Sequence, residues 1–169
     1  MSSQLRVDKI LPVDGAPTNG GGGIIQIKQT FLNTATSTTT SGSYTDISGM
    51  SVSITPKFNT SKVFIILSLG CISSNGGISV GFRLLRDSTL IGNAADTTLQ
   101  SGFTNIYDGG DASLMSASFN FLDSPATTSA VTYKIQWRNS SGTTYLNRYT
   151  GSSDSYNGSS TITAMEVSA

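Results

Sequence analysis

The sequence predicts an all-β protein: an antiparallel β-sandwich of the jelly-roll type, preceded by an extended N-terminal arm. Three observations lead to this class. Apolar and polar residues alternate with a period of two along most of the chain, which is typical of strands with one buried face. Ser and Thr together make up about 50 of the 169 residues, whereas Glu occurs once. No stretch shows a convincing helical period, and the residues that build long helices are scarce.

The first 23 residues differ in composition from the rest of the chain. Apolar and charged residues mix over the first eleven positions, and PVDGAPTNGGGG then brings two prolines and the glycines 20–23. Such a stretch cannot continue a helix or a strand. We therefore expect an arm with a Gly-rich linker over residues 1–23 and a β-sandwich domain over residues 24–169.

The second part contains eight to ten segments with strand character. Turn sequences such as SNGG, YDGGD and NSSG separate them. The clearest strands are expected at residues 25–31, 50–55, 63–71, 78–84, 115–121, 131–138, 145–149 and 161–167. The segment VFIILSLGC is apolar on both faces, so it should be the central and most buried strand, with Cys71 as a small buried residue.

Composition also excludes several functions. The absence of His excludes Ser-His-Asp catalysis and the usual zinc sites. Ten basic and ten acidic residues cancel, so nothing favours nucleic acid or an anionic membrane, and the longest apolar run is too short to span a bilayer. No signal peptide is visible at the start. We expect a binding or structural protein made in a cytoplasm, not an enzyme, with no cofactor and no metal.

Two loop regions hold the residues best suited to contact a ligand. These are Tyr107, Asp108 and Asp111 in YDGGD, and Tyr149, Asp154 and Tyr156 around TGSSDS. A loop tyrosine can stack on a sugar or a protein surface while its polar neighbours form hydrogen bonds. Three alternatives stay open: the tyrosines could pin loops onto the sandwich, Asp108 and Asp111 could contribute to a calcium site, and turn aspartates could form a catalytic pair.

Self-association is a further expectation. The predicted strands carry few charges, and weakly charged strand edges associate unless another subunit covers them. Low charge, exposed edges and a short arm together favour an oligomer, for which three-fold packing is the best hypothesis.

Several long strings in the chain belong to a recognisable pattern. They are LRVDKILPVDGAPTNGGGGIIQI at the start, then SITPKFNTSKVFIILSL, FRLLRDSTLIG, NFLDSPATTSAVTYKIQW, TTYLNR and STITAMEVS. In these strings the sequence resembles tail-fibre-like virion structural proteins of marine bacteriophages of the cyanophage type. The resemblance implies a virion protein assembled in the host cytoplasm, most simply as a homotrimer.

The same resemblance implies a role for the arm. Leu5, Val7, Asp8, Lys9 and Ile10 would attach the protein to a phage capsid or tail protein, and the sandwich would point outward toward a host surface glycan or protein. A chain this short cannot form a long fibre. The expected role is a short tail-fibre or spike-like component or a head-surface component; the alternatives are a capsid decoration protein without a receptor role and a carbohydrate-binding module.

Overall fold

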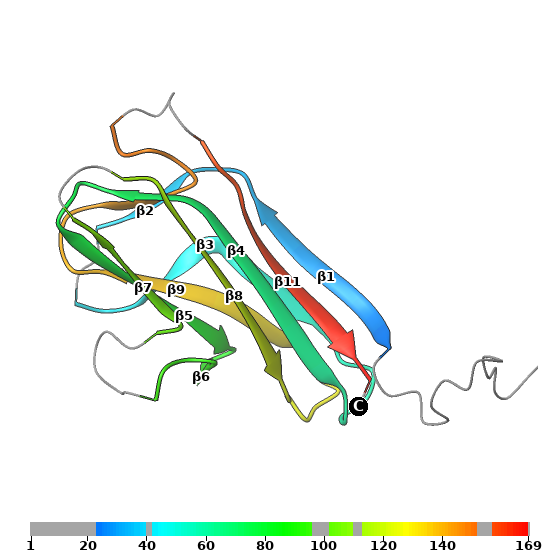
Figure 1. Ribbon diagram of the computed structural model, residues 1–169. Helices are drawn as coiled ribbons and strands as arrows, with labels where there is room; N and C mark the ends of the chain where they lie inside the picture. The colour runs from blue at the N-terminus through cyan, green and yellow to red at the C-terminus, as the bar shows by residue number, and fades with distance from the viewer. Residues whose placement is uncertain (1–22, 40–41, 96–101, 110–112, 152–156, 169) are drawn as a thin grey trace, which may run out of the picture.

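The computed structural model describes residues 23–39, 42–95, 102–109, 113–151 and 157–168 (Figure 1). Within these ranges the chain forms eleven strands and no helix, which confirms the all-β class. The strands are β1 (Ile24–Leu32), β2 (Thr36–Thr38), β3 (Thr45–Ile54), β4 (Lys62–Ser74), β5 (Ile78–Arg86), β6 (Thr89–Ile91), β7 (Thr104–Asp108), β8 (Met115–Asp123), β9 (Val131–Asn139), β10 (Thr144–Leu146) and β11 (Ser160–Val167).

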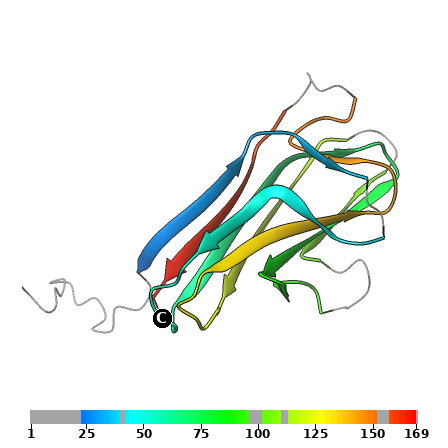
Figure 2. The ribbon, with the colours of Figure 1, turned by 180° about the vertical axis from the view of Figure 1, so that it is seen from behind.

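Eight of these strands form two antiparallel sheets that face each other (Figures 1 and 2). Sheet I has the order β1-β11-β4-β8, and sheet II has the order β3-β9-β5-β7. Among these eight strands, the chain changes sheet at every step except from β5 to β7. This is the strand order of a jelly roll, so the predicted topology is confirmed. The short strands β2 and β10 extend sheet I beside β4, and β6 pairs with β5.

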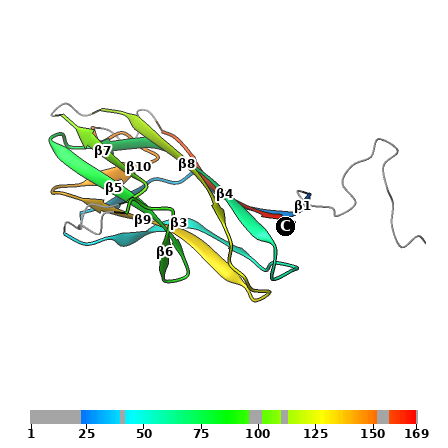
Figure 3. The same ribbon diagram turned by 60° about the horizontal axis from the view of Figure 1, so that its bottom comes forward.

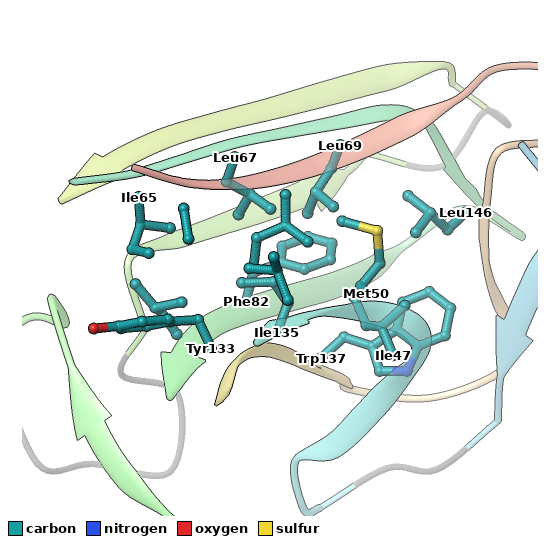
Figure 4. Close-up of a cluster of buried hydrophobic side chains, with 14 of the residues drawn as sticks. Ile47, Met50, Ile65, Leu67, Leu69, Phe82, Tyr133, Ile135, Trp137 and Leu146 are labelled. Carbon is teal, nitrogen blue, oxygen red and sulfur yellow. The ribbon is translucent and has the colours of Figure 1, made fainter. Parts of the chain in front are cut away.

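The core lies between the two sheets and is built by alternate residues (Figure 4). On β4, Ile65, Leu67 and Leu69 point inward and are fully buried. They meet the inward side chains of sheet II, such as Phe82 and Ile135. Each large apolar side chain buried in this way contributes roughly 1.5–3 kcal/mol to folding.

The sandwich has two distinct ends (Figures 1 and 3). At the end that we call proximal, β1 begins and β11 stops: the backbone N–H of Ser168 donates to the carbonyl of Gly23 over 3.0 Å. Val167 pairs there with both Ile24 and Lys62. The turn at residues 75–77, between β4 and β5, lies at the opposite end, which we call distal.

The strand predicted to be buried on both faces is buried on one. β4 is central in sheet I, as expected, but Phe64 is half-buried and Ile66 is 37% exposed. Cys71 is half-buried at a bulge, with a φ of 48°, and burial raises the pKa of its thiol. An apolar run on a strand therefore did not distinguish a buried second face from an exposed one.

Two further segments differ from the prediction. The strand expected at residues 145–149 ends at Leu146, because Asn147 has a φ of 63° and turns the chain. The side-chain amide of Asn147 donates to the carbonyls of Leu32 and Thr34 over 2.9 and 3.1 Å. β7 was not predicted, because TNIYD offers only two apolar side chains and runs into a glycine-rich turn sequence.

Candidate functional site

Tyr107 is the most accessible of the predicted contact residues. It lies on β7 at the distal end, paired with Ser79 just after the β4–β5 turn. Its side chain is 67% exposed. The ring is thus held by a regular strand while its surface stays open to solvent, an arrangement suited to stacking on a ligand.

Asp108, the next residue, points the opposite way. It is 1% exposed, so its carboxylate lies between the sheets and not on the surface predicted for it. Its Oδ2 atom accepts hydrogen bonds from the Ser74 hydroxyl at 2.8 Å and the Ser113 backbone N–H at 3.4 Å. Because successive side chains on a strand face opposite sides, the exposure of Tyr107 and the burial of Asp108 both follow from their adjacent positions on β7.

Tyr149 belongs to a segment that is tied to the same end. The Ser73 hydroxyl donates to the carbonyl of Arg148 over 2.9 Å, and the Thr150 hydroxyl bonds to the amide oxygen of Asn75 at 2.6 Å. Tyr149 itself is half-buried. The structure therefore brings the Tyr107 and Tyr149 segments to the same end, next to the β4–β5 turn.

The remaining predicted site residues lie outside the described ranges. They are Asp111, Asp154 and Tyr156 of the contact set, and Leu5, Val7, Asp8, Lys9 and Ile10 of the attachment set. Their roles stay predictions.

Sequence reasoning missed a polar surface on the outer side of sheet II. The Arg83 guanidinium lies over the ring of Tyr44, with Cζ 4.1 Å from the ring centroid. Burial raises the pKa of Tyr44, and the charges of Arg83 and Arg138 partly oppose this shift. A Cβ atom at Gly81 would come within 2.5 Å of the Tyr44 hydroxyl and 2.7 Å of the Asn105 side-chain oxygen, so glycine permits this close approach. The available signal was Arg83 at a polar position of a strand, opposite Gln136.

Two other acids are engaged in structural contacts at the proximal end. Asp123 accepts from Arg86 Nη1 at 2.8 and 2.7 Å and from the Tyr133 hydroxyl at 2.7 Å. Burial and this hydrogen bond raise the pKa of Tyr133 far above its ordinary value. Glu166 is fully buried and accepts from Gln26 Nε2 and from the backbone N–H of Lys57, each at 2.6 Å. These carboxylates hold strands together.

Among the residues that the structure describes, no group of three or more His, Cys, Asp or Glu side chains is arranged to hold a metal ion. The described part of the chain also contains no helix long and apolar enough to cross a bilayer.

Comparison with known proteins yields distant structural likeness alone. No family model and no curated protein matches the sequence. The tripod from the baseplate of bacteriophage Tuc2009 matches with a TM-score of 0.35 and 16% identity, covering 100% of this chain and 79% of that chain. The VP2 subviral particle of infectious bursal disease virus matches with a TM-score of 0.40 and 16% identity, covering 86% of this chain and 38% of that chain. A mutant VP2 of the same virus matches with a TM-score of 0.41 and 14% identity, covering 94% of this chain and 40% of that chain. These neighbours are phage baseplate and viral capsid proteins, but likeness at this level carries no argument about what the chain does.

Proposed function

We propose that this chain is a structural component of a bacteriophage particle, attached through residues 1–23 and presenting its jelly roll outward. The observation that carries the proposal is the position of β1. Residues 1–22 precede the strand that begins at the proximal end, whereas the exposed Tyr107 and the Tyr149 segment lie at the distal end. Attachment and contact with a host surface would thus use opposite ends of the jelly roll.

The resemblance of the opening LRVDKILPVDGAPTNGGGG to particle-attached phage proteins supports the assignment of the attachment end. The composition of the body supports its external placement. Its strands use Ser and Thr at many polar positions, and only 12% of the residues are charged, about half the usual share. Several copies per particle would convert weak individual contacts into strong overall binding.

The test is incorporation into particles of a phage that carries the gene. The full chain, a variant lacking residues 1–22, and a variant with Leu5, Val7 and Ile10 changed to Ser are supplied during infection, and the protein is quantified in gradient-purified particles. We expect both variants to retain the unfolding temperature of the full chain and to be incorporated at least about tenfold less, which corresponds to about 1.4 kcal/mol of attachment energy. Undiminished incorporation of both variants, or absence of the full chain from particles, would refute the proposal.

The second candidate function is carbohydrate binding at the distal end. The 67% exposure of Tyr107 favours it, because an open aromatic ring is the usual platform for a sugar. Glycan-array and host-cell binding of the Tyr107→Ala variant would be compared with Phe58→Ala, which removes an exposed ring outside the distal site. A loss confined to Tyr107→Ala supports a receptor role. Absent glycan and cell binding of the unaltered chain, together with normal incorporation, supports a decoration protein without that role.

A further inference from the structure

The outer face of sheet I carries apolar side chains that nothing in the described structure covers. On β4, Val63, Ile65 and Leu67 point into the core, so Phe64 and Ile66, which alternate with them, point out of the sandwich. Ile66 is 37% exposed. This second apolar face of β4 is the reason that the strand was predicted to be buried on both sides.

The apolar surface extends across the whole width of sheet I. Directly paired residues of antiparallel strands share a face, and the pairings connect one row across four strands. From β1 to β8 the row is Ile27, Met165, Phe64 and Leu122. Its two ends, Ile27 and Leu122, are 54% and 48% exposed. With Ile24 and Ile66 in the adjacent rows, these side chains form what we call the apolar patch.

The patch is concentrated in the proximal half of the face. The other members of the row of Ile66 are polar: Gln29, Thr163 and Asn120. The next row toward the distal end is polar over β11, β4 and β8, with Thr161, Ser68 and Ser118, and only its member on β1, Phe31, is an exposed apolar side chain. The outer face of sheet II is polar as well, with Lys134 bonded to Asp46 at 2.8 Å. The chain thus has polar side chains on the other exposed sheet faces, and large contiguous apolar patches on a protein surface mark interaction sites.

Charge indicates what covers the patch. The outward side chains of its rows include a single charge, Lys62 at the margin, and the whole chain has a formal net charge of zero. A strongly acidic or basic partner would find no complementary charge here. An identical copy brings an equally large and uncharged apolar surface and meets no like-charge repulsion, which is the condition for a self-complementary interface.

The strand edges favour the same occupant. β1 has a single neighbour in sheet I, β11, and β8 pairs with β4 alone, so both sides of the patch end in strands whose outer edge has no partner within the described chain. Such edges are sites of association between chains. Copies seated on one another's patches would also shield these two edges.

We propose that the apolar patch is the surface through which copies of this chain associate. If the copies are arranged around an axis parallel to the strands, the residues 1–22 of every copy start from the same end of the assembly. Only this parallel arrangement of the copies rests on the proposed function. The interface itself does not, because it is defined by Ile27, Phe64, Leu122 and Met165. Three-fold association remains the prediction for the number of copies.

The test measures mass in solution with the full chain by sedimentation and light scattering over a concentration series. We expect a species near three times 17.6 kDa. Leu122→Asp should weaken association about 30-fold or more, since a charge that becomes buried in an apolar interface is poorly tolerated. Ser118→Asp, on the same strand and the same face but in the polar half, is the matched control and should leave the mass unchanged. Unfolding temperatures of both variants report on folding.

A second measurement does not depend on substitution. Backbone hydrogen exchange in β1 and β8 of the unaltered chain should slow as its concentration rises, because association covers these edges. A monomeric full chain, or an oligomer that persists in both Leu122→Asp and Ile27→Thr, would overturn the proposal. So would an oligomer that is lost only when residues 1–22 are removed. Failure here is distinguishable from failure of the proposed function, because mass is measured on the free protein and attachment on particles.

Discussion

The proximal and distal ends of the jelly roll differ in how several of their buried polar side chains are hydrogen-bonded. At the proximal end, Asp123 accepts from both Arg86 and Tyr133, and Glu166 accepts from Gln26 on β1 and from the backbone of Lys57. Each carboxylate joins segments far apart in the sequence. The proximal end is therefore held by charge-assisted hydrogen bonds at the point where β1 begins.

At the distal end, three buried polar atoms have no hydrogen-bond partner within the described part of the chain: Oδ1 of Asp108, Oδ1 of Asn139 and Oγ1 of Thr144. In Asn139, the side-chain Nδ2 atom donates to the carbonyls of Ser141 and Gly142 over 3.1 and 2.8 Å. These two bonds fix the orientation of the amide and leave its Oδ1 atom without a donor. Buried groups without partners do not stabilise a fold. The comparison shows that the two proximal carboxylates each accept several hydrogen bonds, whereas these three distal groups each keep an unpaired atom. The contrast concerns these groups and not every buried polar residue, because Asn147 at the distal end is well bonded and Oγ of Ser61 near the proximal end is not.

The largest effect is expected for Asp123→Ala. It leaves the Arg86 guanidinium and the Tyr133 hydroxyl without their acceptor at the edge of the core, and such losses cost about 3–5 kcal/mol. Urea unfolding at pH 7 measures the change. Tyr133→Phe, which removes one donor and keeps the ion pair, should cost only about 1 kcal/mol. If Asp123→Ala destabilises the protein by less than about 1 kcal/mol, the ion pair between Arg86 and Asp123 does not stabilise the proximal end.

An intermediate and pH-dependent effect is expected for Glu166→Gln. Burial by itself raises the pKa of Glu166, but the hydrogen bonds that its carboxylate accepts from the Gln26 side chain and the backbone N–H of Lys57 oppose this effect, and the pKa is held below its ordinary value. A lowered pKa in the folded state means that this stabilisation is present at neutral pH and is lost as the pH falls through that pKa.

Unfolding curves between about pH 7 and pH 3 test this expectation. Glu166→Gln should lose about 1–3 kcal/mol at pH 7 and show a shallower decline toward acid than the unaltered chain. Asp46→Asn is the control. The hydrogen bond from Lys134 also lowers the pKa of Asp46, but this ion pair is exposed to solvent, so the substitution should change the free energy of unfolding less than Glu166→Gln does. An acid dependence that Glu166→Gln leaves unchanged would contradict the assignment.

The smallest effect is expected for Thr144→Val at the distal end. The hydroxyl of Thr144 is fully buried without a partner, so a methyl group of the same shape should leave stability unchanged or raise it by up to about 1 kcal/mol. Thr163→Val is the matched comparison, because the Thr163 hydroxyl accepts from Gln29 Nε2 at 2.8 Å and its loss should destabilise. If Thr144→Val destabilises as much as Thr163→Val, the contrast between bonded and unbonded polar groups fails.

The candidate site shows where sequence reasoning stops. Tyr107 and Asp108 were predicted together as loop residues of YDGGD, and the structure puts one in solvent and the other in the core. The cause is that both belong to β7, whose alternation separates neighbours in sequence. The Tyr44 and Arg83 surface was missed because Tyr44 lies just before β3 and Arg83 lies on β5, and the packing of such distant segments is not visible in local composition.

Alternation along the chain by itself determined the all-β class, the jelly-roll prediction and the position of most long strands, because the period of two is a property of each strand taken alone. Only the tertiary structure decided which apolar face of β4 is buried and that Ile27 and Leu122 lie on the outside. Likewise, it decided that Glu166 closes the proximal end while Asp108 keeps an unpaired oxygen. Those outcomes depend on which strands become neighbours and which sheet lies opposite, and a strand's own sequence carries neither.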